Sequence, residues 1–349
     1  MILGTYGHGG DVYRNRVTLD FSANVNPFGT PEPVKAAIRA AADEVNRYPD
    51  PYCTALREKL AARHGVSPEN ILCGNGAAEL IFSFVSALRP KIALLPVPSF
   101  AEYETALNAV SADVRFLPLL REEGFAVNAR ILDAITEDAD VLMLCSPNNP
   151  TGRSVEPKLL LAILERCRTT GTWLFLDECF TDLCDAEKSF SLAGYIEKND
   201  RVLLLHAFTK TYGMAGVRLG YAISKHAAML LQMSGTTQPW NVSTVAQRAG
   251  LAALDCAGWA ENARVLFREE KAYLIAALSA LGVSALPGDA NYLLLSGVPG
   301  LYETLLARGI LVRNCENYRG LERGDVRIAV RTHAENEALI AAISEALHG

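Results

Sequence analysis

The sequence has no apolar stretch long enough to cross a membrane, since no run in its 349 residues approaches the ~20 apolar residues that a transmembrane helix needs. It also lacks an excess of positive charge: 33 Lys and Arg stand against 39 Asp and Glu, a net charge of −6. A negative chain is a poor electrostatic match to nucleic acid or anionic lipid. We therefore expect neither a membrane nor a nucleic acid among its partners.

Cysteine pairs with the spacing of a metal or redox motif are absent as well. Eight cysteines occur, but no two of them form C-x-x-C, and we predict no metal site. The first sixteen residues lack the basic-then-apolar order of a secretory leader. A disulfide framework is not expected in a chain of this size. We therefore expect reduced, mostly buried thiols in a cytoplasmic protein.

What the sequence does contain is an alternation of apolar runs and amphipathic stretches. Half of the residues are hydrophobic and 21% are charged, which is typical of a globular protein. Several runs are apolar on both faces, as in strands buried in a sheet that is covered by helices. The seven runs are 71–74, 91–97, 112–117, 140–146, 172–178, 201–208 and 218–224. Helical spacing at 52–65, 100–110 and 156–171 predicts crossover helices, hence an α/β domain with a seven-stranded, mostly parallel sheet.

The pattern changes near residue 240. A long helical region at about 242–281 precedes two short strands, 292–296 and 325–331, and further helices follow around 299–308 and 334–347. This order predicts a smaller α+β domain, joined by a helix at 31–45. The predicted organisation is an N-terminal segment (1–45) that packs with the small domain, a large domain (46–240), and an interdomain helix with the small C-terminal domain (241–349).

Two loops after predicted strands carry residues suited to ligand binding. The first contains Gly76 and Ala77 at the start of a helix, where free backbone N–H groups can hold a phosphate. Such a turn by itself is more often structural. The second, SPNNPTG, begins at Ser146, and its two prolines and two asparagines favour a rigid loop that directs Asn149 toward a ligand.

Three charged residues lie at or next to the ends of the next predicted strands. Asp177 ends a buried strand and needs a partner, which could be a cationic ring nitrogen, a helix N-terminus or a structural salt bridge. Lys210 follows another buried strand, where burial or nearby cations lower an amine pKa and suit it to bond with an aldehyde. Arg218 can bind a phosphate with two N–H groups. Together these are the parts of a pyridoxal phosphate site.

The segments GNGAAE, PSFAEY, SPNNPTG, DECF, FTK and GVRLGY, in this order, resemble those of the fold-type I pyridoxal-phosphate enzymes in the class I/II aminotransferase superfamily. The resemblance implies the pyridoxal-phosphate-dependent transferase fold, with the large and small domains described above. It implies that Lys210 binds the cofactor covalently, that Asp177 meets its ring nitrogen and that Asn149 meets its ring hydroxyl. The residues implied for the cofactor phosphate are Gly76, Ala77, Thr209 and Arg218.

The resemblance also assigns two aromatic residues. Phe100 is implied to stack on the cofactor ring, with Tyr103 as the nearest rival. In such enzymes a tyrosine contacts the cofactor phosphate of the neighbouring subunit. Tyr48, in NRYPDPY, resembles that tyrosine, so a homodimer is implied. Ala207 is a departure, because relatives often place there a serine that helps to hold the phosphate.

Two branches of the family resemble the chain most. Histidinol-phosphate aminotransferases share segments like DFSANVNPFG and RYPDPY. Threonine-phosphate decarboxylases of cobalamin side-chain synthesis share the His8-Gly9-Gly10 segment, LVRNCENYRGL and RIAVRTHAEN. The residues matching that second branch's substrate contacts are His8, Gly9, Asn24, Asn149, Arg313 and Arg327.

The resemblance therefore implies a decarboxylase that converts L-threonine O-3-phosphate into (R)-1-amino-2-propanol phosphate. The first alternative is transamination of histidinol phosphate or a related substrate. A more remote alternative is a non-catalytic pyridoxal-phosphate-binding protein such as a regulator. It is disfavoured because Lys210 and Asp177 are both present and because the net charge is negative.

Overall fold

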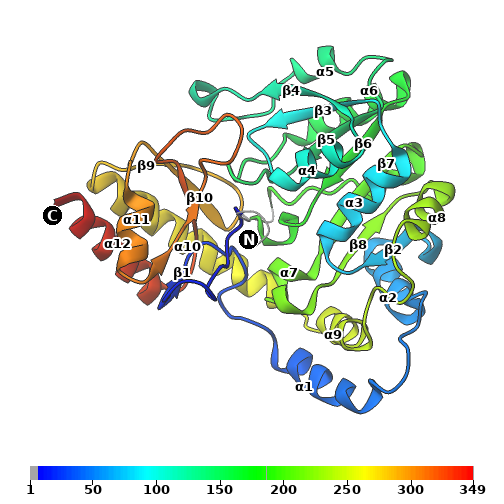
Figure 1. Cartoon of the computed structure of the whole chain (residues 1–349), viewed down its shortest axis with the longest axis horizontal. Coiled ribbons are helices and arrows are strands. Elements are labelled where there is room, and N and C mark those ends of the chain that lie inside the picture. Colours follow the sequence, from blue (N-terminus) through cyan, green and yellow to red (C-terminus); the bar gives the residue numbers. More distant parts are fainter. Residues whose placement is uncertain (1–6, 186, 349) are drawn as a thin grey trace.

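The computed structural model describes residues 7–185 and 187–348, and its larger part is built on a seven-stranded sheet (Figure 1). The strands are β2 (Ile71–Gly74), β3 (Ile92–Val97), β4 (Asp113–Pro118), β5 (Val141–Cys145), β6 (Trp173–Asp177), β7 (Val202–Ala207) and β8 (Gly220–Ile223). Their order is β2-β8-β7-β6-β5-β3-β4, and β8 alone runs against its neighbours in this sheet. All seven predicted strands are confirmed, with ends that differ by no more than two residues.

Helices cover both faces of this sheet, which explains why most of its strands are apolar on both faces; the edge strand β4, by contrast, exposes Asp113 and Arg115. Along β6, Leu174 and Leu176 belong to one core and Phe175 to the other. The helices of the first face are α2 (Thr54–His64), α5 (Ile131–Ala134), α6 (Pro157–Thr170) and α9 (Thr244–Leu254); those of the second are α3 (Ala77–Leu88), α4 (Ala101–Ala109) and α8 (Ala227–Gly235).

The smaller part is an antiparallel sheet of order β12-β13-β10-β9 packed against helices. Its elements are α10 (Trp259–Ala280), β9 (Ser284–Leu286), β10 (Tyr292–Ser296), α11 (Leu301–Ala307), β12 (Arg313–Asn314), β13 (Val326–Ala329) and α12 (His333–His348). The predicted strands at 292–296 and 325–331 are confirmed as β10 and β13. The helical region expected at 242–281 is divided into α9 and α10 at Gly258, whose positive φ of 77° ends any continuous helix.

The N-terminal segment reaches both parts of the molecule. Its strand β1 (Leu19–Asp20) pairs in parallel with β11 (Ile310–Leu311) of the smaller part, and its helix α1 (Glu32–Ala41) packs on α9 (Figure 1). The domain boundaries proposed from the sequence stay predictions. In the described residues, no helix combines the length and the apolar character needed to span a membrane.

Candidate active site

A cavity of about 160 Å³ lies where β5, β6 and β7 end. Parallel strands present their carboxyl ends at one edge of the sheet, so residues far apart in the sequence meet there. The predicted site residues that line this cavity are Ala77, Phe100, Asn149, Asp177, Thr209, Lys210 and Arg218. Ala207, the departure noted in the sequence, lines it too.

Lys210 lies in α7 (Phe208–Thr211), a single helical turn that begins directly after β7. Its Nζ donates to Asn24 Oδ1 at 3.3 Å and lies 5.6 Å from the ring centre of Phe180. Burial, together with the guanidinium groups of Arg327 and Arg218, lowers the pKa of this amine to about 8. The direction of this shift agrees with the lowered pKa expected from the sequence.

Asp177, at the end of β6, is only 6% exposed. Its Oδ2 accepts a hydrogen bond from the Tyr103 hydroxyl at 2.6 Å, and its Oδ1 accepts one from the Cys179 N–H at 2.9 Å. Burial raises the pKa of this carboxyl, whereas these hydrogen bonds and Lys210 act in the opposite direction. Within residues 7–185 and 187–348 it forms no ion pair, so the carboxylate is available to a cationic ligand atom.

The start of α3 forms an anion cradle together with Arg218. Gly76 precedes the helix with φ +84°, and a Cβ added to it would lie 2.4 Å from Arg218 Nη2. A Cβ on Gly220 would meet the Ala77 nitrogen at 2.7 Å. The guanidinium and the first amides of the helix therefore crowd around one point, where helix dipole and cation both favour a phosphate.

These groups fit pyridoxal phosphate: the cradle suits its phosphate, Lys210 its aldehyde, and Asp177 its ring nitrogen. Asn149 completes the set. Its Oδ1 accepts from Arg327 Nη1 and, at 3.4 Å, from the Tyr318 hydroxyl. With Oδ1 occupied, the amide Nδ2 of Asn149 is the atom left to donate to a ring oxygen.

Two predicted substrate residues, Arg313 and Arg327, face each other on β12 and β13. Both side chains are buried. Arg327 Nη2 donates to the Ser22 carbonyl at 2.7 Å, and Arg313 Nη2 donates to Asn317 Oδ1 at 2.8 Å. The Arg313 guanidinium also lies 5.0 Å from the ring centre of Tyr318.

The N-terminal segment lies against the same strands. Gly9 packs on Ser22 so closely that a Cβ would lie 2.4 Å from its carbonyl oxygen. His8 Nε2 lies 3.0 Å from Glu102 Oε1, and His8 lines a neighbouring hollow of about 420 Å³ together with Arg313. Asn24, the remaining predicted residue, is buried beside Lys210. The structure thus places all six predicted substrate residues around the cavity or in this adjoining hollow.

Tyr48 lies apart from the cavity. It is 77% exposed and stacks on Trp240, with ring centres 4.4 Å apart. Of the two aromatic candidates for ring stacking, Phe100 lines the cavity, and Tyr103 has its hydroxyl on Asp177. The sequence reasoning missed that bond, although the spacing of Phe100 and Tyr103 on one helical turn hints at a shared site.

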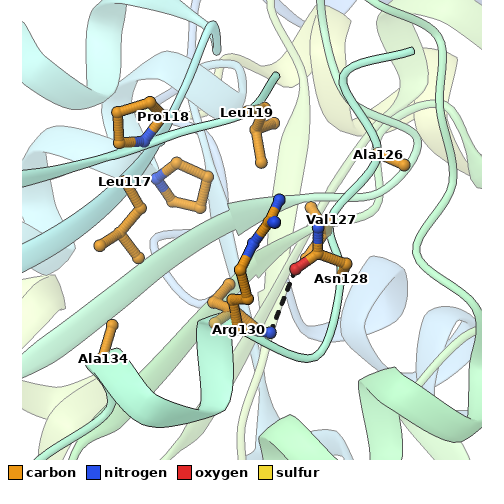
Figure 2. A pocket seen from close by; sticks show the side chains of 10 residues that line it. Leu117, Pro118, Leu119, Ala126, Val127, Asn128, Arg130 and Ala134 are labelled. Carbon is orange, nitrogen blue, oxygen red and sulfur yellow. Dashed lines mark hydrogen bonds between the residues drawn. The ribbon is translucent and has the colours of Figure 1, made fainter. Parts of the chain in front are cut away.

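Another hollow, of about 180 Å³, lies beside the edge strand β4 (Figure 2). Its wall is mostly apolar, with Leu117, Pro118 and Val127 among the labelled side chains, and Arg130 is its charged member. None of the predicted site residues lines it. No group of three or more His, Cys, Asp or Glu in the described part of the chain is arranged to hold a metal ion.

Fold and site together define an enzyme dependent on pyridoxal phosphate. The family model for class I and II aminotransferases matches residues 16–343, and the chain belongs to this family. It is 39% identical to threonine-phosphate decarboxylase of Salmonella typhimurium over 100% of this chain and 99% of that protein. It is 35% identical to histidinol-phosphate aminotransferase of Symbiobacterium thermophilum, over 94% of this chain and 90% of that one.

A solved structure gives the same result at the level of the fold. The histidinol-phosphate aminotransferase of Clostridium acetobutylicum superposes with a TM-score of 0.88 at 26% identity, covering 95% of this chain and 99% of that chain. The predicted fold class is thereby confirmed.

Proposed function

We propose that this enzyme decarboxylates L-threonine O-3-phosphate to (R)-1-amino-2-propanol phosphate for the cobalamin side chain. The likeness to a threonine-phosphate decarboxylase over the full length of both chains supports this activity. The observation that carries the phosphorylated substrate is the pair of buried guanidinium groups on β12 and β13, whereas the choice of decarboxylation rests on the likeness.

Arg313 and Arg327 are direct partners across the two strands, and like charges in that position repel each other. Their hydrogen bonds go to neutral oxygens, those of Ser22, Asn149, Asn314 and Asn317. In the described chain neither guanidinium has a carboxylate partner. Two buried cations without a counter-charge suit a ligand that carries two negative charges, such as a phosphate monoester.

The neighbouring N-terminal segment supports a small phosphorylated substrate. Asn317, a partner of Arg313, also donates to the Gly7 carbonyl at 3.2 Å. The Gly10 N–H donates to Ser22 Oγ at 2.7 Å. These bonds tie residues 7–10 to Asn317 and Ser22, which are themselves partners of Arg313 and Arg327.

The chemistry follows from this placement. Bound pyridoxal phosphate would supply an electron sink for the bond that breaks at the substrate α-carbon. If Arg313 and Arg327 hold the substrate phosphate, they would not hold the α-carboxylate, which would then be free to leave as CO₂. The amine of Lys210, half-buried with a lowered pKa, is the group suited to return a proton to the α-carbon.

The second candidate is transamination of histidinol phosphate, favoured by the fold-level likeness to a histidinol-phosphate aminotransferase. The same two arginines would hold its phosphate. This substrate has no carboxylate, so a Cα–H bond breaks instead.

One pair of assays separates the two reactions. The purified holoenzyme is given threonine phosphate, and CO₂ and aminopropanol phosphate are measured; in parallel it is given histidinol phosphate with 2-oxoglutarate, and glutamate is measured. We expect CO₂ from the first and no glutamate from the second, with Lys210→Ala inactive in both. Glutamate in the second assay without CO₂ in the first would show that the enzyme is an aminotransferase and not a decarboxylase.

We also propose that the enzyme acts as a homodimer in which Tyr48 serves the partner's cofactor phosphate. Tyr48 is exposed and does not line the cavity of its own subunit, but its ring stacks on Trp240. Val45 and Tyr52 nearby in the chain are exposed as well, 64% and 71%. Exposed apolar side chains grouped in this way are typical of a protein interface.

A further inference from the structure

Tyr103 on α4 is completely buried, and its hydroxyl reaches the catalytic pocket. The oxygen lies 2.6 Å from Asp177 Oδ2, a short distance typical of a hydrogen bond to a charged acceptor. The ring makes edge contacts with Phe100 and Phe175, whose ring centres lie 5.7 and 6.0 Å away. These contacts hold the ring in place with its hydroxyl beside the carboxylate and near the Cys145 thiol.

Cys179 also stabilises the Asp177 carboxylate through its thiol and its N–H, but the N–H bonds Oδ1, whereas Tyr103 donates to Oδ2. Cys145 is the direct partner of Asp177 on β5, but the Cys145 thiol donates to the Pro147 carbonyl at 3.1 Å. Burial raises the thiol pKa of both Cys145 and Cys179, so neither brings a charge to the site. Burial likewise raises the pKa of the Tyr103 hydroxyl well above its usual value, which keeps it a donor at any physiological pH.

We propose that Tyr103 is a positioning residue that keeps Asp177 ionised and turned toward the cofactor ring nitrogen. It acts through Asp177 and touches no reacting atom. This role is the same for decarboxylation and for transamination, so it does not depend on which substrate the enzyme uses.

The physical consequence concerns one proton. A buried carboxylate that loses a hydrogen-bond donor becomes more basic, because less of its charge is stabilised. In the loaded enzyme this carboxylate faces the protonated ring nitrogen of pyridoxal phosphate. A more basic Asp177 takes a larger share of that proton, and a ring nitrogen without its proton withdraws electrons less strongly.

The test is Tyr103→Phe, measured without any substrate. The visible absorbance of bound pyridoxal phosphate changes with pH. The pH at which half of this change has occurred, the midpoint, is higher when the ring nitrogen carries no proton. We expect Tyr103→Phe to raise this midpoint by about one pH unit, in the same direction as Asp177→Asn. In an Asp177→Asn background we expect no further rise, because the carboxylate through which Tyr103 acts is gone.

Tyr221→Phe is the matched control. Tyr221 is also buried, and its hydroxyl bonds His64 Nε2 at 2.8 Å, away from Asp177. We expect this variant to keep the wild-type midpoint. Equal midpoints for Tyr103→Phe and Tyr221→Phe, or a full additional rise in the Asp177→Asn background, would show that Tyr103 has only a packing role. Both results are independent of the substrate assays.

Discussion

Lys210 differs from an exposed lysine in how readily its amine gives up a proton. Burial and two nearby guanidinium groups together lower its pKa to about 8, whereas an ordinary lysine has a pKa near 10.4. Only the neutral amine attacks an aldehyde. The difference therefore decides how fast the cofactor-free enzyme binds pyridoxal phosphate at neutral pH.

We predict that the rate constant for covalent binding of pyridoxal phosphate to the apoenzyme rises about tenfold per pH unit below the pKa and levels off above pH of about 8. The sign follows from the neutral fraction, which grows as pH increases through the pKa. Stopped-flow absorbance at several pH values measures this rate. A rate that continues to rise tenfold per unit beyond pH 9 would mean that Lys210 titrates like an exposed lysine.

The helix α3 depends at its first turn on a residue without a side chain. Gly76 has φ +84°, a conformation that L-residues rarely adopt, and Arg218 occupies the space where its Cβ would stand. Both facts concern the same cradle, because the α3 amides and the guanidinium are the groups placed for the cofactor phosphate.

We predict that Gly76→Ala raises the dissociation constant of pyridoxal phosphate about tenfold or more, equivalent to ~1.4 kcal/mol, since the new methyl group displaces Arg218. Equilibrium dialysis or fluorescence titration measures the constant. Gly235→Ala, at the end of α8, is the matched control, because a Cβ there meets nothing within 4 Å. An unchanged dissociation constant of pyridoxal phosphate in Gly76→Ala would show that the cradle does not bind the cofactor.

At the scale of the whole molecule, one site is built from residues of distant segments. Arg327 from β13 bonds Asn149 from the loop after β5 and Ser22 from the N-terminal segment. Arg121, after β4, pairs at 2.6 Å with the buried Asp325 just before β13. Both parts of the chain must therefore be in contact for the site to exist.

The proposed dimer extends this dependence to a second chain, and we predict complementation between two defective subunits. A heterodimer of Lys210→Ala and Tyr48→Ala chains, isolated by two different affinity tags, retains one site with both residues intact. We expect about half of the wild-type turnover, because a two-fold dimer has two equal sites. Turnover no higher than that of the Tyr48→Ala homodimer would mean that Tyr48 serves its own subunit or none.

The sequence alone determined the elements that repeat a simple pattern. Apolar runs identified all seven strands of the large sheet, and several of them are apolar on both faces because helices cover both sides of the sheet. The polar residues that follow these runs identified most of the cofactor site, because parallel strands end at one edge. Strands of two or three residues, such as β1 and β9, are too short to show alternation and are not predicted.

Only the tertiary structure decided which distant side chains meet. The bond from Tyr103 to Asp177 joins residues 74 positions apart, and the pairing of Arg313 with Arg327 depends on the register of two strands. Neither contact produces a periodic pattern in the sequence, because a long-range contact depends on how elements pack and not on local spacing. The absence of a counter-charge beside the arginines also became visible only once every neighbouring element was in place.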